Sequence, residues 1–254
     1  MNKVSHYLIF ALFCTVFLES CNVEVEKTVT PNIILFLVDD MGWQDTSVPF
    51  WDKKTPYNAL YKTPNMERLA SEGMKFTDAY ATAVCSPTRV SLMTGMNAAR
   101  HRVTNWTLRK DNLQPMEKNH PDLTFPQWNV NGLSPVSGIK HSIHATTLPG
   151  VLKNAGYFTI HSGKSHLGAI DTPGENPINL GFDINIGGHA AGAPGSYLGV
   201  DNFGNEDKGR EVWAVPGMEP YYGKDIFLTE ALTLEAMKAM DTAVATKKPF
   251  FLYM

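Results

Sequence analysis

An apolar segment that ends in two carboxylates constrains the fold more than any other feature of this sequence. Residues 32–38 read NIILFLV, and Asp39, Asp40, Met41 and Gly42 follow directly. A continuous β-prone apolar run is typical of a strand buried on both faces of a parallel sheet. Ligand sites in such sheets form beyond the carboxyl ends of the strands. The two aspartates therefore mark the sheet edge at which a site is expected.

Beyond this segment, strand patterns alternate with helical patterns. Two stretches, residues 101–146 and 171–224, interrupt the alternation with many Asn, His, Pro and Gly residues. Alternating strands and helices predict an α/β fold with a mostly parallel central sheet flanked by helices. Long loops in a compact domain are usually functional or disordered, and here the interspersed aromatic residues favour packed, site-forming loops. The further strand candidates are residues 157–161 and 249–253, and the helix candidates are residues 65–72, 147–154 and 225–246.

The composition narrows the class of protein. The chain has 254 residues, enough for one large domain or two small ones with a hydrophobic core. Its 25 acidic and 22 basic residues give a formal net charge of -3. A phosphate-backbone binder needs an excess of lysine and arginine, so no nucleic-acid partner is expected. Three cysteines cannot build a disulfide framework, so each needs its own explanation.

The N-terminus has the pattern of an export signal. Lys3 precedes an apolar run over residues 7–18, which is shorter than the roughly 20 residues that span a bilayer. The pattern predicts a secretory signal over residues 1–20; the alternative is a buried element of the fold. The segment LESC resembles the bacterial lipobox, which implies acylation of Cys21, a tether over residues 21–31 and a membrane anchor. The expected location is the periplasm, or the outer membrane or cell surface as a lipoprotein.

The segment CSPTR, which begins at Cys85, combines a cysteine with a helix start. Ser86 is a good N-cap, Pro87 a good first helical residue, and Gly95 a stop signal. Cys85 is then expected just before a helix N-terminus, where free N–H groups and the helix dipole favour an anion. Arg89 adds a cation whose forked donors suit an oxyanion. The alternative is an ordinary buried cysteine ahead of a capped helix.

Other polar residues are candidates for the same chemistry. Asp39 and Asp40 can converge on one hard cation in the turn after the strand, and oxygen ligands predict calcium; the alternative is a solvated turn. Lys164 and His166 are two residues apart, so extended backbone projects both to the same side, where they can hold an anion and exchange a proton; the alternative is a pair of surface residues. His189, in a glycine-rich loop, is a candidate substrate contact or a residue that fixes local backbone.

Three of these segments together resemble one known family. PNIILFLVDDMG, CSPTR and GKSHLG occur in this order over residues 31–168, and they are similar to the type I sulfatases of the alkaline phosphatase superfamily. The resemblance implies the fold of that superfamily and the oxidation of Cys85 to Cα-formylglycine by a maturation enzyme. It also implies that Asp39, Asp40 and the converted residue bind Ca²⁺.

The resemblance further implies roles in a reaction. A hydrated formylglycine has two hydroxyl groups, so one attacks sulfur and the other, once deprotonated, expels the sulfate. Arg89 and Lys164 neutralise the charge that develops on the sulfate oxygens. His166 contacts the sulfate or helps to protonate the leaving group.

The expected function is the hydrolysis of sulfate esters, with a sulfated glycan or an aryl sulfate as substrate. Two alternatives stay open: a phosphoesterase or phosphonate hydrolase of the same superfamily, and a non-catalytic lipoprotein that binds sulfated polysaccharide. The resemblance makes residues 32–254 the N-terminal part of a sulfatase catalytic domain, because the family's further metal ligands and a later lysine follow the strand at 249–253. We therefore expect a sheet that is incomplete at the C-terminus, weak calcium binding and little turnover from this chain alone.

Overall fold

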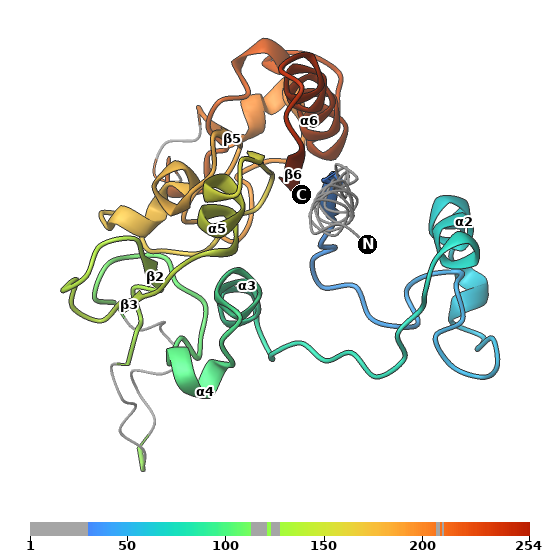
Figure 1. Cartoon of the computed structure of the whole chain (residues 1–254), viewed down its shortest axis with the longest axis horizontal. Helices are drawn as coiled ribbons and strands as arrows, with labels where there is room; N and C mark the ends of the chain where they lie inside the picture. Colours follow the sequence, from blue (N-terminus) through green and yellow to red (C-terminus); the bar gives the residue numbers. More distant parts are fainter. Residues whose placement is uncertain (1–29, 113–120, 123–127, 207–208, 210) are drawn as a thin grey trace, which may run out of the picture. The chain divides into compact units, whose positions relative to one another are not determined.

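The chain divides into two compact units, residues 1–31 and 32–254, and Figure 1 colours the described residues along the sequence. The expected signal at 1–20, Cys21 with its lipid, and the tether up to residue 29 lie outside the described residues, so these expectations stay predictions. The computed structural model describes residues 30–112, 121–122, 128–206, 209 and 211–254.

Parallel strands form the central sheet, as the alternating pattern predicts. Both later strand candidates are confirmed, as β4 and β6, and β5 falls in a stretch that the sequence pattern left without a strand. The strands are β1 (Ile33–Leu35), β4 (Phe158–Ser162), β5 (Ile184–Ile186) and β6 (Phe250–Tyr253), in the order β1-β6-β4-β5, with every neighbouring pair parallel.

The expectation that β1 is buried on both faces is wrong for the described chain. Ile34 and Phe36 are 56% and 59% exposed, whereas Ile33 and Leu35 pack against a core cluster. The reason is position: β1 lies at the edge of the sheet and pairs only with β6 among the described strands. Pairing continues past the strand, since the N–H of Leu37 donates to the carbonyl of Met254 over 2.7 Å.

The predicted helices are confirmed as α2, α5 and α6. α6 begins at Leu228 rather than at residue 225, because Phe227 is extended and bridges Leu198 in an antiparallel pair. The helices are α2 (Pro64–Glu72), α3 (Cys85–Thr94), α4 (Ala98–His101), α5 (Leu148–Asn154) and α6 (Leu228–Ala245), and β2 (Leu133–Ser134) pairs with β3 (Ile143–His144). Short 3₁₀ helices are η2 (Asn58–Leu60), η4 (Pro173–Glu175), η5 (Pro177–Leu180), η6 (Gly199–Gly204), η7 (Glu211–Trp213) and η8 (Glu219–Tyr221). None of the described helices combines the length and the apolar character needed to cross a bilayer.

Helices cover both faces of the sheet. Alternate residues of β6 point into different clusters: Phe250 and Leu252 pack with α6, and Phe251 and Tyr253 pack with α3 and α5. This period of two is what a central strand buried on both faces requires. Figure 1 shows α6 on one side of the strands and α3 and α5 on the other. The result is a three-layer arrangement whose carboxyl strand ends are held in place from both sides.

A histidine is buried inside this sheet. His161, on β4, is fully buried, and its Nδ1 lies 3.1 Å from Oδ1 of Asn185. The rings of Phe182 and Tyr253 meet it edge-on, with centroids 5.3 and 5.5 Å away. Burial lowers the pKa of His161 to about 3, with a further lowering from the charge of Arg89, and the hydrogen bond to Asn185 opposes the change. His161 is therefore neutral at neutral pH.

Acid is expected to destabilise this fold through His161. The unfolded chain takes up a proton near the ordinary pKa of 6.5, whereas folded His161 does so only near 3. The stabilisation is complete above about pH 6.5 and is lost as the pH falls toward 3, by about 1.4 kcal/mol per pH unit. Urea unfolding at several pH values measures this slope in the wild type and in His161→Gln. Between about pH 6.5 and 3, the free energy of unfolding of His161→Gln should change with pH by about 1.4 kcal/mol per pH unit less than that of the wild type. Equal slopes in the two proteins would contradict the assignment.

Candidate active site

Polar residues from separate segments meet where β1, β4 and β6 end. Asp39 and Asp40 follow β1, Lys164 follows β4, and Tyr253 is the last residue of β6. Cys85 opens α3 close by: ligand atoms of Asp39, Asp40 and Cys85 all lie within 4.8 Å of one another. The site therefore forms at the carboxyl edge of the sheet, where the sequence pattern places it.

α3 begins earlier than the sequence pattern indicates. Cys85 is its first residue and Val84 is the N-cap, without a side-chain cap, so the assignment of Ser86 as N-cap is wrong. The hydroxyl of Ser86 instead accepts a hydrogen bond from the N–H of Thr107 over 3.1 Å. The predicted stop at Gly95 is confirmed, with φ at 68°. Cys85 therefore lies within the first turn, among N–H groups that have no partner inside the helix.

Arg89 is buried and held by three acceptors. Its NH1 donates to the carbonyl of Lys164 over 2.6 Å and to the hydroxyl of Tyr253 over 3.0 Å. Its NH2 donates to Oδ1 of Asp39 over 3.1 Å, and only 3% of the residue is exposed. Its buried Nε has no partner among the described residues. The guanidinium is thus fixed one turn of helix from Cys85.

Asp39 joins both cations of the site. Its Oδ1 faces Arg89 and its Oδ2 lies 2.6 Å from Nζ of Lys164. Partial burial acts to raise the pKa of Asp39, but the hydrogen bonds and charges of Lys164 and Arg89 outweigh it and hold the pKa below the usual 3.8. Asp39 is therefore a carboxylate at neutral pH. Asp40 has a left-handed backbone, with φ at 53°.

The two carboxylates are ligands of the type that a hard cation prefers, but together with residue 85 they are too few to complete its coordination. Carboxylate oxygens suit calcium, whereas the Sγ of Cys85 is a soft donor that does not. An oxygen-bearing derivative of Cys85 would complete a set of three hard donors. Calcium takes 6–8 oxygens, so the rest must come from elsewhere. Both oxygens of Asp39 already have cationic partners.

His166 does not lie beside Lys164 as extended backbone would place it. Its backbone is left-handed, with φ at 52°, and its buried ring points its Nε2 at the carbonyl of Thr107, 2.6 Å away. Burial lowers its pKa to about 4, and the charges of Lys164 and Arg89 add to this, against the hydrogen bond to Thr107. A neutral ring that donates Nε2–H to Thr107 has only a lone pair at Nδ1. In this arrangement His166 has no N–H for a leaving group, and its role stays a prediction.

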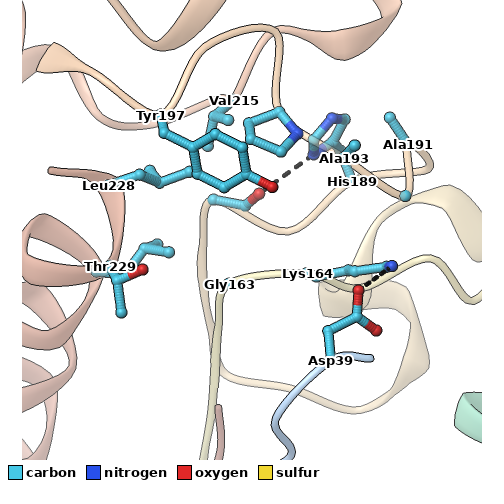
Figure 2. A pocket seen from close by; sticks show the side chains of 14 residues that line it. Asp39, Gly163, Lys164, His189, Ala191, Ala193, Tyr197, Val215, Leu228 and Thr229 are labelled. Atoms are coloured by element: carbon cyan, nitrogen blue, oxygen red, sulfur yellow. Dashed lines mark hydrogen bonds and ion pairs between the residues drawn. The ribbon is translucent and has the colours of Figure 1, made fainter. Parts of the chain in front are cut away.

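His189 lines a cavity beside the ion pair. The cavity measures about 220 Å³, and Asp39 and Lys164 form part of its wall with His189. Figure 2 shows the Lys164–Asp39 pair across this cavity from Tyr197, with His189 near the ring. The structure thus brings together Cys85, Asp39, Asp40, Arg89, Lys164 and His189, and it turns the ring of His166, which is close enough to feel the charges of Lys164 and Arg89, onto the carbonyl of Thr107.

Sequence reasoning assigned no role to Tyr253, and it counted Tyr197 only among the aromatic residues that favour site-forming loops. Tyr253 belongs to a strand that the pattern identified, and its position at the carboxyl end of a parallel strand is a signal that could have found it. Tyr197 lies in the irregular stretch 171–224, and no motif there indicates which side chain turns toward the site.

The arrangement can bind a tetrahedral oxyanion. Arg89 and Lys164 supply two cations, and the first turn of α3 supplies N–H groups next to position 85. In the absence of such an anion, both cations contact the single carboxylate of Asp39. The geometry therefore suits chemistry at an anionic centre next to residue 85.

Comparisons with known proteins identify one family. A family model described as Sulfatase matches residues 31–254. The chain is 31% identical over 236 residues to N-acetylgalactosamine-6-sulfatase of Mus musculus, covering 88% of this chain and 38% of that protein. It is 29% identical over 226 residues to a protein named sulfatase from Formosa agariphila, covering 87% and 38%. The crystal structure of Ps i-CgsB in complex with k-i-k-neocarrahexaose matches with a TM-score of 0.55 and 27% identity, over 89% of this chain and 44% of that one. The chain thus spans less than half the length of each of these proteins.

Removing the hydroxyl of Tyr253 is expected to destabilise the protein, because this hydroxyl accepts a hydrogen bond from the buried Arg89. Tyr253→Phe leaves the buried NH1 of Arg89 with one acceptor instead of two, which should lower the free energy of unfolding by about 1–2 kcal/mol. Urea unfolding measures the change. Tyr157→Phe is the matched control, because Tyr157 is also buried and its hydroxyl has no hydrogen bond among the described residues. Equal effects of the two substitutions would contradict a supporting role for Tyr253.

Proposed function

The chain belongs to the sulfatase family, and from this we propose that the protein hydrolyses sulfate esters carried by glycans. One observation carries the proposal: Arg89, Lys164 and Asp39 form a fixed charged cluster next to residue 85 at the first turn of α3. A cluster with two cations at a helix N-terminus suits an ester whose transferred group is a tetrahedral anion.

Arg89 and Lys164 bind the sulfuryl oxygens in this proposal. Arg89 is held by Tyr253 and by the carbonyl of Lys164, so it needs little rearrangement when charge develops on the reacting group. Lys164 has a side chain that is only 18% exposed, so its charge is weakly screened. Fixed cations in a partly dehydrated site contribute the largest share of stabilisation in such reactions.

Residue 85 supplies the nucleophile after modification. We propose that a maturation enzyme oxidises Cys85 to Cα-formylglycine, for which the match of CSPTR to the family pattern is the support. A hydrated aldehyde at this position would provide one hydroxyl group to attack sulfur while the bond from sulfur to the sugar oxygen breaks. The second hydroxyl group would then lose its proton, so that the aldehyde forms again and the bond to the sulfate breaks. Cys85 is partly buried, and no disulfide involves it.

Asp39 and Asp40 are the proposed ligands of a calcium ion, together with oxygen from the modified residue 85. The bound cation would lower the cost of bringing an anionic ester to a negatively charged nucleophile. The remaining ligands come from outside this group of three. Asp39 has both oxygens on cations, so it exchanges partners when the ion binds.

Glycans are the proposed carriers of the sulfate. Relatives in support are N-acetylgalactosamine-6-sulfatase of Mus musculus and Ps i-CgsB, whose structure contains k-i-k-neocarrahexaose. We also propose that the protein acts outside the cytoplasm, in the periplasm or at the cell surface, with lipid on Cys21 as its anchor. The N-terminal pattern of Lys3, the apolar run and LESC supports this location.

Removing the charge of Lys164 should lower the rate of sulfate release. In protein produced from its own gene in a host with the maturation enzyme, Lys164→Met is expected to lower kcat by roughly 100- to 1,000-fold, because the developing charge loses a fixed partner. Release of sulfate from a monosulfated sugar measures the loss. Lys153→Met is the matched control: Lys153 forms a similar ion pair with Asp183 at 2.7 Å, and neither residue lines the cavity. Similar rates for wild type and Lys164→Met would contradict the assignment.

Modification of residue 85 has its own test. Mass spectrometry of the peptide that contains Cys85 is expected to show an aldehyde in place of the thiol, and Cys85→Ala is expected to abolish sulfate release. Phosphate esters assayed beside sulfate esters should react more slowly. An unmodified thiol in active protein, or faster release of phosphate, would overturn the proposed chemistry.

A further inference from the structure

The cavity beside the Lys164–Asp39 pair is small and close to the proposed reaction centre. Its volume of about 220 Å³ lies below the roughly 300–1,000 Å³ of sites for drug-sized ligands. It opens next to Lys164, whose Nζ contacts Asp39. A ligand that places a sulfate on Lys164 can therefore place one ring in this cavity.

The wall away from the ion pair is mostly apolar. Leu228 and Leu232 come from α6, and Val215 comes from the segment after η7. Pro194 and Ala193 come from the loop that precedes Tyr197. Side chains of this kind favour the C–H face of a ring over a strongly hydrated group.

Tyr197 is presented rigidly at this cavity. One face of its ring stacks on Phe227, with centroids 5.5 Å apart and planes at 7°. Its carbonyl accepts from the N–H of Leu228 over 2.8 Å, where the chain enters α6. Tyr197 is still 52% exposed, and it lines the cavity. A fixed aromatic ring at low entropic cost is a platform for stacking.

His189 is part of the same wall. Its Nδ1 lies 3.2 Å from the carbonyl of Gly187 and must donate to it. Nε2 then carries a lone pair, and it is buried without a partner among the described residues. Burial lowers the pKa of His189, which keeps the ring neutral. This nitrogen is covered by its neighbours, so the hydrogen bond to Gly187 is the contact by which His189 fixes this part of the wall.

Asp39 carries one negative charge against Lys164 and Arg89, so the reacting sulfate supplies the second negative charge that balances these two cations. Lys164 is the only lysine or arginine among the described residues that line it, and Asp39 holds its Nζ at 2.6 Å. The sulfate to be hydrolysed takes this cation. A second anionic group on the same ring would lose water without gaining a partner.

We propose that this cavity binds the sugar ring that carries the reacting sulfate, that Tyr197 stacks on this ring, and that the ring bears no second anionic group. The inference rests on the proposed function and names the substrate class of the same site: sulfate monoesters of uncharged sugar rings. Tyr197 is then a residue that determines specificity.

The test measures binding without turnover. In a Cys85→Ala background, calorimetry follows the binding of methyl hexopyranosides with one sulfate at each ring position in turn, and of methyl sulfate, which has no ring. Tyr197→Ala is expected to weaken the tightest of the sugar sulfates by about 10-fold, because the stacking surface is lost. Tyr197→Phe keeps the ring and should stay within about 3-fold. Ile178→Ala, at an exposed apolar residue of η5, is the control outside the cavity.

Two further ligands test the role of the sugar ring and the role of its charge separately. Tyr197→Ala should leave the binding of methyl sulfate unchanged, and adding a second sulfate or a carboxylate to the best sugar should weaken its binding by about 10-fold or more. Absence of binding by every monosulfated ring, an unchanged affinity in Tyr197→Ala, or tighter binding of the doubly charged sugar would overturn the inference. The proposed function fails on a different result, the absence of sulfate release from nitrophenyl sulfate and sugar sulfates by the mature wild-type protein.

Discussion

The contact of both oxygens of Asp39 with two cations organises this site. Arg89 comes from α3, Lys164 from the loop after β4, and Asp39 from the end of β1, so one carboxylate joins three segments that are far apart in the sequence. Arg89 and Lys164 would repel each other without it. The carbonyl of Lys164 and the hydroxyl of Tyr253 complete the acceptors around Arg89, so that within the described part of the chain only its Nε lacks a partner.

The parts of the fold that follow from periodicity could be predicted from the sequence. The apolar runs of β1, β4 and β6 and the patterns of α2, α5 and α6 identify the elements, and the rule that sites form at carboxyl strand ends brings Asp39 and Lys164 together. The start of α3 could not be predicted in the same way, because Thr107, 21 residues later, occupies the hydroxyl of Ser86. A cap residue is a local signal, and a tertiary hydrogen bond overrides it.

His166 shows the same limit within the site. Two residues of spacing place side chains together only if the backbone is extended, and φ at 52° breaks that condition. The carbonyl of Thr107 then determines which ring nitrogen carries the proton. Neither the backbone angle nor the acceptor can be inferred from GKSHLG. Tyr197 is the opposite case, a side chain that no motif marks and that the bridge between Leu198 and Phe227 positions at the cavity.

Asp39 has two uses that compete, and the competition links the proposed metal to the proposed substrate. A calcium ion on Asp39 would take the place of the cations that now satisfy its oxygens, which would leave Arg89 and Lys164 without an anion. A sulfate ester supplies that anion, because its oxygens can accept from both side chains at once. Binding of the cation and of the ester should therefore favour each other, by the reciprocity that governs any two coupled ligands. Arg89 is too deeply buried to find solvent as a substitute partner, so the coupling depends on it more than on Lys164, which lies nearer the surface.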